Sequence, residues 1–215
     1  MGNPPWPAVL WFHGFTVDRN ASRPELEALA RAGLLAVGID AVGHGARRLP
    51  DFDRYFGGPK EEFTPRFLDL VSQTVAEVPA LFDHLRDAGL ADERHLAVGG
   101  VSMGGYITYG AVVLDRRIQA AVPLLGSPEW DHPDSPHLHP DRFYPTALLS
   151  ITGGADTDVP PDRARAFHRT LEERYRDDPD RLRYIEIEGA PHMMHPADWV
   201  GAVREAVAWI ARFCE

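Results

Sequence analysis

Short runs of apolar residues alternate along the chain with longer stretches in which apolar residues recur every three or four positions. The short runs have the length and content of buried strands, and the longer stretches have the period of a helix. The predicted strands are Ala8–Phe12, Leu34–Ile39, His95–Val98, Ala120–Leu125, Ala147–Thr152 and Leu182–Ile187. Because the segments between them are long enough for crossovers, we expect an α/β fold with about six mostly parallel strands and helices on both faces.

The longer stretches predict the helices. In the clearest one the apolar residues share a single helical face, and they are Phe67, Val71, Val75, Val78, Phe82 and Leu85. Pro79 lies inside this stretch and predicts a kink, because proline has no N–H and its ring crowds the preceding turn. Further helices are expected over about Tyr106–Leu114, Arg163–Arg176 and Ala197–Phe213.

Two stretches break this alternation. Arg47–Pro65 contains Gly57-Gly58-Pro59, and Ser127–Pro145 is rich in proline, so neither is expected to form a regular helix. We expect both to be loops over the sheet. No shift in composition marks a domain boundary, so residues 1–215 are predicted to form one domain with a short cap or loop insert at about 127–145.

Composition and charge narrow the class of protein. Of the 215 residues 44% are hydrophobic and 25% are charged, which is typical of a soluble globular protein. The formal charge of −10 argues against a nucleic-acid-binding or anionic-membrane surface and favours a neutral or weakly charged small-molecule substrate. Cys214 is the only cysteine, so an internal disulfide is excluded. With neither a signal-peptide pattern nor an apolar run of about 18 residues, the chain is expected to be cytoplasmic.

A G-x-S-x-G motif, Gly100-Val101-Ser102-Met103-Gly104, follows one predicted strand and precedes a helical stretch. A serine on such a sharp turn is pushed into solvent, and glycines on both sides allow the chain to bend and pack closely. Ser102 is therefore the predicted nucleophile. The motif alone is also compatible with a glycine-rich helix entry in which the serine is an N-cap.

A serine hydroxyl becomes a good nucleophile when a base takes its proton and a third group orients that base. In the fold that carries this turn the chain order is serine, acid, histidine. Asp156 follows the fifth predicted strand and is the predicted acid, with Asp158 as the alternative. His192 lies early in the loop after the last strand and is the predicted base, with His195 as the alternative.

Catalysis at a carbonyl also needs an oxyanion hole, in which two N–H groups point at the developing negative charge. The residue after the nucleophile, Met103, supplies one N–H. The other is expected from the loop after the first strand, where His13-Gly14-Phe15 makes the Phe15 amide the candidate.

Five short motifs occur in order along the chain: His13-Gly14-Phe15, Asp40-Ala41-Val42-Gly43-His44-Gly45, Gly100-Val101-Ser102-Met103-Gly104-Gly105, Asp156 followed by Val159-Pro160, and Gly189 followed by His192. Over about residues 8–213 the series resembles the α/β-hydrolase superfamily, in particular small bacterial serine esterases related to dienelactone hydrolases and to the catalytic domain of prolyl oligopeptidases. The resemblance implies the α/β-hydrolase fold, a catalytic triad at the carboxyl edge of the sheet, no cofactor, and ester hydrolysis through an acyl-enzyme. The family spacing before Val-Pro favours Asp156 over Asp158.

The chain departs from the family at two places. Relatives usually have an antiparallel hairpin before the first strand of this chain, so we expect a trimmed sheet whose exposed edge permits either a monomer or a homodimer. The insert 127–145 is short, and its aromatic residues make Trp130 and Tyr144 candidate substrate-binding residues, although a proline-stiffened surface loop is an equal alternative. Its histidines have no helical or hairpin frame, so no metal site is predicted.

These observations favour a serine carboxylesterase that hydrolyses small, short-acyl esters through an acyl-enzyme on Ser102. A thioesterase, an acyltransferase or a peptidase would use the same triad and remains an alternative. A non-catalytic binding module on the same fold is the less favoured reading, because it would not need the complete set of site residues.

Overall fold

The computed structural model describes residues 3–214, whose six strands form one parallel sheet in the order β2-β1-β3-β4-β5-β6. The strands are β1 (Trp6–Phe12), β2 (Leu35–Ile39), β3 (Ala91–Val101), β4 (Ile118–Leu124), β5 (Ala147–Gly153) and β6 (Leu182–Ile187). The prediction of about six mostly parallel strands is confirmed. Since β1 lies between β2 and β3, the strand order reverses beside it, and ligands of such sheets bind at the carboxyl ends of the strands at that point.

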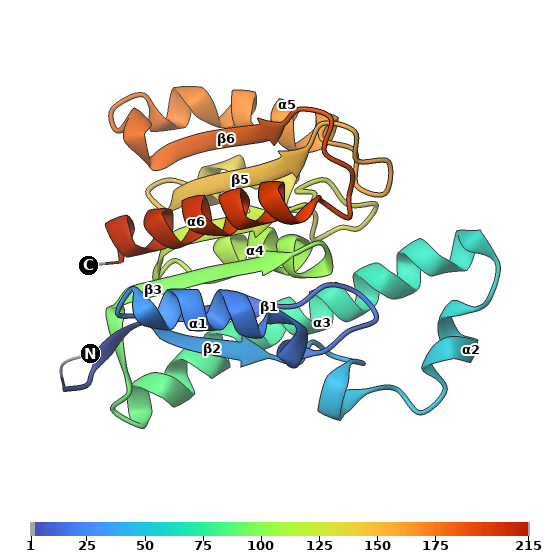
Figure 1. Ribbon diagram of the computed structural model, residues 1–215, viewed down its shortest axis with the longest axis horizontal. Coiled ribbons are helices and arrows are strands. Elements are labelled where there is room, and N and C mark those ends of the chain that lie inside the picture. Colours follow the sequence, from blue (N-terminus) through green and yellow to red (C-terminus); the bar gives the residue numbers. More distant parts are fainter. Residues whose placement is uncertain (1–2, 215) are drawn as a thin grey trace.

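Helices cover both faces of the sheet, as predicted. They are α1 (Arg23–Arg31), α2 (Phe52–Phe56), α3 (Lys60–Asp87), α4 (Met103–Leu114), α5 (Asp162–Leu171) and α6 (Pro196–Phe213), with 3₁₀ turns at Arg19–Ser22, Gly45–Arg47, Pro136–Leu138, Pro140–Arg142, Glu172–Tyr175 and Pro179–Arg181. In Figure 1 helices α1 and α6 lie in front of the sheet, and α3 and α4 lie behind it. Helix α1 is not among the helices predicted from the sequence.

Two hydrophobic cores lie on the two faces of the sheet, and β1 contributes to both. Leu10 and Phe12 belong to the core under α3, α4 and α5, whereas Val9 and Trp11 belong to the core under α1 and α6. Successive side chains of a strand point to opposite faces, so a strand buried on both sides is apolar at every position. This is why β1, which lies inside the sheet, is an unbroken apolar run in the sequence.

The prediction that Arg47–Pro65 is a loop is wrong. Helix α2 occupies part of it, and α3 begins at Lys60 and continues through both Pro65 and Pro79. Pro65 lies early in α3, where its missing N–H removes a single helical hydrogen bond, to the carbonyl of Glu61. Glu61 is exposed, so water can replace that donor. Figure 1 shows α2 and the first turns of α3 lying beyond the carboxyl ends of the strands.

The segment Ser127–Pro145 contains two short 3₁₀ turns and no α-helix, in agreement with the sequence. It is nevertheless well packed, since Trp130, Ser135 and Phe143 are buried. Trp130 lies against Gly110 of α4, where a Cβ would come within 2.9 Å of the indole ring. The segment is therefore fixed to α4 at its tryptophan.

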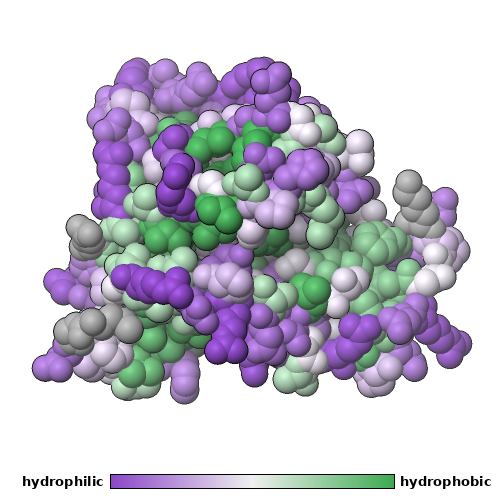
Figure 2. Space-filling view, viewed as in Figure 1, coloured by the Kyte–Doolittle hydropathy of each residue, from purple (hydrophilic) through white to green (hydrophobic). Residues whose placement is uncertain are grey.

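The view in Figure 2 shows hydrophilic residues around most of the outline and hydrophobic residues gathered toward the middle. Among residues 3–214, no helix is both long and apolar enough to cross a bilayer.

Candidate active site

Ser102 lies on the sharp turn between β3 and α4. Its φ of 54° falls in the left-handed region, and its N–H donates to the carbonyl of Leu124 at 2.8 Å. The flanking glycines are needed because the backbone of β1 approaches closely. A Cβ at Gly100 would lie 2.6 Å from the carbonyl oxygen of Phe12, and one at Gly104 would lie 2.1 Å from the same atom. The G-x-S-x-G pattern is thus a packing requirement of this turn.

Ser102, His192 and Asp156 form one hydrogen-bonded series. The Oγ of Ser102 is 2.9 Å from Nε2 of His192, and Nδ1 of His192 is 2.7 Å from Oδ2 of Asp156. The other oxygen of Asp156 accepts the N–H groups of Asp158 and Val159 at 2.9 and 2.8 Å. Because a carboxylate only accepts, Nδ1 of His192 carries the proton and Nε2 is left to accept from the serine hydroxyl.

Asp158 and His195, the alternative acid and base, contribute no side chain to this hydrogen-bonded series. Asp158 contributes its backbone N–H to Asp156, and its side chain lines the cavity in front of Ser102. His195 is exposed and precedes the first residue of α6. The structure therefore brings together Ser102, Asp156 and His192 and leaves Asp158 and His195 aside.

Both candidate oxyanion donors lie beside Ser102. Met103 is the first residue of α4, so its N–H has no acceptor within the helix. Phe15 lines the same cavities as Ser102, and the preceding Gly14 is so close that a Cβ there would lie 3.9 Å from that of Ser102.

His13, which the sequence analysis did not single out, fixes the loop that carries Phe15. Its Nε2 accepts the N–H of Ala41 at 3.1 Å, so its Nδ1 donates to the carbonyl of Gly14 at 2.7 Å. Burial lowers the pKa of His13, which keeps the ring neutral and this pattern intact. The Gly14 carbonyl and the Phe15 N–H belong to one planar peptide and point in opposite directions. By holding the carbonyl, His13 orients the N–H.

A cavity of about 740 Å³, called here the aromatic cavity, opens in front of Ser102 and His192. Its apolar wall consists of Phe15, Phe63, Phe67, Leu68, Tyr106, Trp130 and Val159. Burial raises the pKa of Tyr106 to about 12, so its hydroxyl remains protonated. Arg163, Asp131 and Asp158 also line the cavity. Its volume is that of a site for a small molecule.

Of the two predicted substrate-binding residues, one lines the aromatic cavity and the other does not. Trp130 lines the aromatic cavity, where its ring stacks against Tyr106 with 6.2 Å between centroids. Tyr144 does not line this cavity, and its ring instead packs edge-on against Tyr175 at 5.3 Å. Tyr144 directly follows Phe143, which is buried in the core, so nothing in this geometry supports a substrate-binding role for Tyr144.

Aromatic side chains of α2 and of the start of α3 gather over the aromatic cavity, and we call them its cover. Phe63 and Phe67 of α3 line the cavity, and Phe56 of α2 packs on Phe15. The ring of Phe15 lies 4.7 Å from that of Phe56, 5.4 Å from that of Phe63 and 5.7 Å from that of Phe67. None of Phe52, Phe56, Phe63 and Phe67 was assigned to the site from the sequence. They nevertheless form two pairs four positions apart, Phe52 with Phe56 and Phe63 with Phe67. That spacing is the signal of a helical face.

A second cavity of about 480 Å³ shares Phe15, Ser102 and His192 with the aromatic cavity. We call it the Glu25 cavity, and its further lining residues include Val17, Ser22, Glu25, Leu125, Met193 and Trp199. Ser102 is thus accessible from two hollows. The sequence gives no periodic or motif signal for this wall, which is assembled from α1, α6 and three loops.

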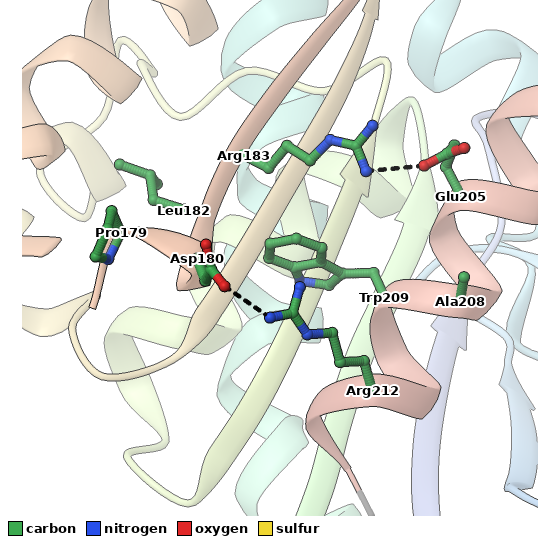
Figure 3. A pocket seen from close by; sticks show the side chains of 8 residues that line it. All are labelled: Pro179, Asp180, Leu182, Arg183, Glu205, Ala208, Trp209 and Arg212. Carbon is green, nitrogen blue, oxygen red and sulfur yellow. Dashed lines mark hydrogen bonds and ion pairs between the residues drawn. The ribbon is translucent and has the colours of Figure 1, made fainter.

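Another hollow lies at the amino end of β6, away from Ser102 (Figure 3). Its charged side chains pair with each other: Arg183 with Glu205 and Arg212 with Asp180, each at 2.9 Å. It contains no serine, cysteine or histidine, so we assign it no chemistry. In the described part of the chain, no three histidine, cysteine or carboxylate side chains are grouped to hold a metal ion.

Comparisons with known proteins find relatives that are described as esterases. YitV of Bacillus subtilis (strain 168), described as a candidate esterase, is 28% identical over 96% of this chain and 89% of its own length. The esterase YjfP of Escherichia coli (strain K12) is 28% identical over 57% of this chain and 46% of its own length. The chain matches no protein-family model.

A crystal structure from Klebsiella pneumoniae, described as that of a candidate dienelactone hydrolase, superposes with a TM-score of 0.76 at 18% identity and covers 99% of this chain and 90% of its own. At that identity the similarity shows the fold. The predicted fold class is confirmed, because the six-stranded parallel sheet with helices on both faces superposes on a protein of this kind over nearly the whole length of this chain. The chain therefore has the α/β-hydrolase fold and is similar in sequence to two bacterial proteins described as esterases.

Proposed function

We propose that this protein is a serine carboxylesterase that hydrolyses small esters with short acyl chains through an acyl-enzyme on Ser102. The observation that carries the proposal is the hydrogen-bonded series Ser102–His192–Asp156 at the mouth of two cavities. A neutral imidazole nitrogen 2.9 Å from a serine hydroxyl is placed to accept its proton. Two bacterial relatives described as esterases support the same reaction class.

In the first half-reaction, Oγ of Ser102 attacks the ester carbonyl carbon as its proton moves to Nε2 of His192. The carbonyl electron pair moves onto oxygen, where the N–H groups of Phe15 and Met103 stabilise the negative charge. When the tetrahedral intermediate collapses, the bond to the alcohol oxygen breaks and His192 returns the proton to that oxygen. The acyl group stays on Ser102.

In the second half-reaction, water attacks the acyl-enzyme and gives its proton to His192. Collapse of the second intermediate breaks the bond to Oγ, which takes the proton back, and the carboxylic acid leaves. Asp156 holds the tautomer of His192 and stabilises the imidazolium that forms in both halves. Its two backbone N–H donors keep its carboxylate fixed while this happens.

The two cavities suggest where the two parts of an ester bind. The aromatic cavity is the larger and exposes more apolar surface in total, so we assign the acyl chain to it and the alcohol to the Glu25 cavity. The aromatic side chains over the aromatic cavity limit the length of the acyl chain that fits there, which supports short acyl groups.

The test is hydrolysis of p-nitrophenyl acetate, butyrate and octanoate by the wild type and by Ser102→Ala. We expect activity in the wild type with a preference for the shorter esters, and a loss of at least about a thousandfold in the variant. A preference for chains of about ten carbons or more would contradict the short-acyl assignment.

A fluorophosphonate probe separates an enzyme from a binding module, because only an activated serine is labelled. Labelling of the wild type, and none of Ser102→Ala, is the expected result. Activity that survives in Ser102→Ala would show that the nucleophile is another residue. A wild type that is folded but neither labelled nor active would overturn the proposal.

A further inference from the structure

A buried carboxylate lies in the wall of the Glu25 cavity, beside the serine and histidine of the site. Glu25 is 5% exposed and comes from the first turn of α1. Its Oε1 accepts the indole N–H of Trp199 at 2.9 Å, but its Oε2 has no hydrogen-bond partner. A buried carboxylate oxygen without a donor is unfavourable. A donor that entered this cavity and bonded to the oxygen would therefore be stabilised.

Among the described side chains of residues 3–214, no arginine or lysine lines the Glu25 cavity. Apart from His192, Glu25 is the only acidic or basic side chain among the described residues that line the Glu25 cavity. The aromatic cavity differs, because Arg163 lies there with Asp131 and Asp158. The formal charge of −10 gives the molecule as a whole an attraction for cations.

We propose that the Glu25 cavity is a subsite for the alcohol part of esters that carry a protonated amine. An N–H⁺ group that enters this cavity would donate to the carboxylate of Glu25 and lie near the indole of Trp199, which also attracts cations. The hydroxyl of Ser22 lines the same cavity and offers a further acceptor. The proposal rests on the proposed esterase activity and names the substrate class of that site.

A purely structural role of Glu25 is the competing explanation, since its hydrogen bond to Trp199 joins α1 to α6. Glu25→Gln distinguishes the two roles. The glutamine has the same length, and its amide oxygen still accepts from the indole N–H, but the negative charge is gone. Glu27→Gln is the matched control, because it makes the same change of net charge on the same helix at a residue that does not line the cavity.

The substrates form a matched set. The cationic ester is 2-(dimethylamino)ethyl butyrate, and the neutral control is 3-methylbutyl butyrate, in which a CH group replaces the protonated nitrogen. The isomer ethyl 4-(dimethylamino)butyrate places the cation on the acyl side instead. We expect the wild type to prefer the first ester over the neutral one by about tenfold or more in kcat/KM at about pH 7.

In Glu25→Gln this preference should fall to about twofold or less, because KM for the cationic ester rises much more than KM for the neutral ester. Glu27→Gln should keep the full preference. An equal loss on both esters in Glu25→Gln would show a structural role and overturn the proposal. A preference for the acyl-side isomer would overturn the assignment of the alcohol to this cavity.

The binding step is tested separately by calorimetric titration of Ser102→Ala with the cationic and the neutral butyrate. Tighter binding of the cationic ester, lost when Glu25→Gln is added, supports the subsite whether or not the wild type turns these esters over. Equal binding of the two esters refutes it. Failure of the esterase activity itself would appear instead as no hydrolysis of any ester, including p-nitrophenyl butyrate, by the wild type.

Discussion

At the scale of single residues, the candidate site depends on backbone groups held by side chains that never touch a substrate. His13 is the clearest case, because it is 1% exposed and bridges the N–H of Ala41 and the carbonyl of Gly14. The same peptide unit carries the Phe15 N–H, one of the two proposed oxyanion donors. His13 is thus a positioning residue.

We expect His13→Leu to lower kcat about 10- to 100-fold with little change in KM, because a misdirected Phe15 N–H weakens only the stabilisation of the intermediate. His13→Asn is the matched variant. Its side-chain N–H₂ occupies the place of Nδ1 and still donates to Gly14, so kcat should recover to within about fivefold of wild type.

Both substitutions remove the acceptor for Ala41, so they should lower the thermal unfolding midpoint by similar amounts. Steady-state kinetics with p-nitrophenyl butyrate and thermal unfolding check the pair. If the two variants lost kcat equally, His13 would act on stability rather than on the direction of the Phe15 N–H.

How far a residue could be predicted depended on whether its signal was local. Ser102 and the glycines beside it are constrained by a single turn, and the motif states that constraint in sequence. Asp156 was distinguished from Asp158 by family spacing, since both follow the same strand. Glu25 has no such signal, because its partner Trp199 lies on the last helix of the chain. The position of Tyr144 outside the aromatic cavity could not be predicted for the same reason, since the sequence of a loop does not reveal where its rings point.

At the scale of the elements, proline and glycine in the sequence argued against the two helices that cover the site. Gly57-Gly58-Pro59 and Pro65 are local signals against a helix, whereas the energy that forms α2 and the start of α3 comes from tertiary packing of phenylalanines on Phe15. Buried strands, by contrast, are apolar at every position and could be predicted.

If this cover limits the acyl chain, shortening one of its side chains should lengthen the preferred substrate. We expect Phe63→Ala to raise the ratio of kcat/KM for p-nitrophenyl octanoate to that for butyrate by about threefold or more, because the aromatic cavity gains the volume of a ring.

Tyr144→Ala is the control for that experiment. It removes a ring of similar size that does not line the cavity, so the octanoate-to-butyrate ratio should stay at the wild-type value. An unchanged ratio in Phe63→Ala, with the variant folded, would mean that the acyl chain binds elsewhere.

At the scale of the whole molecule, the topology explains why one edge of the sheet carries all of the proposed chemistry. Parallel strands present their carboxyl ends together, and the reversal of strand order places the turn after β1 beside the turn after β3. Asp156 and His192 follow β5 and β6 at the same edge. The alternation of strands and helices in the sequence predicts the parallel sheet, because that depends on period and length, whereas the position of the site at its carboxyl edge was implied by the family resemblance.

The core behind the site carries a polar network that links α4, β5 and α5. The hydroxyl of Ser150 lies 2.6 Å from that of Tyr109 and 2.7 Å from Nε2 of His168. Burial lowers the pKa of His168 to about 3, so the ring is neutral in the folded protein. In the unfolded chain a histidine takes up its proton near pH 6.5. Between about pH 6.5 and about pH 3, the unfolded chain therefore binds a proton at this histidine, whereas the folded protein does not.

This difference predicts how stability depends on pH. A depressed pKa in the folded state means that the contribution of His168 is complete above about pH 6.5 and is lost as the pH falls toward 3, at about 1.4 kcal/mol per pH unit. His168→Gln has no titrating ring. It should be less stable than wild type at pH 7, and the gap should narrow by up to about 2.7 kcal/mol at pH 4.5, as measured by urea unfolding.

A gap between wild type and His168→Gln that stayed constant between pH 7 and pH 4.5 would contradict this prediction. It would mean that His168 is protonated in the folded core, and that the network with Ser150 and Tyr109 accommodates its charge.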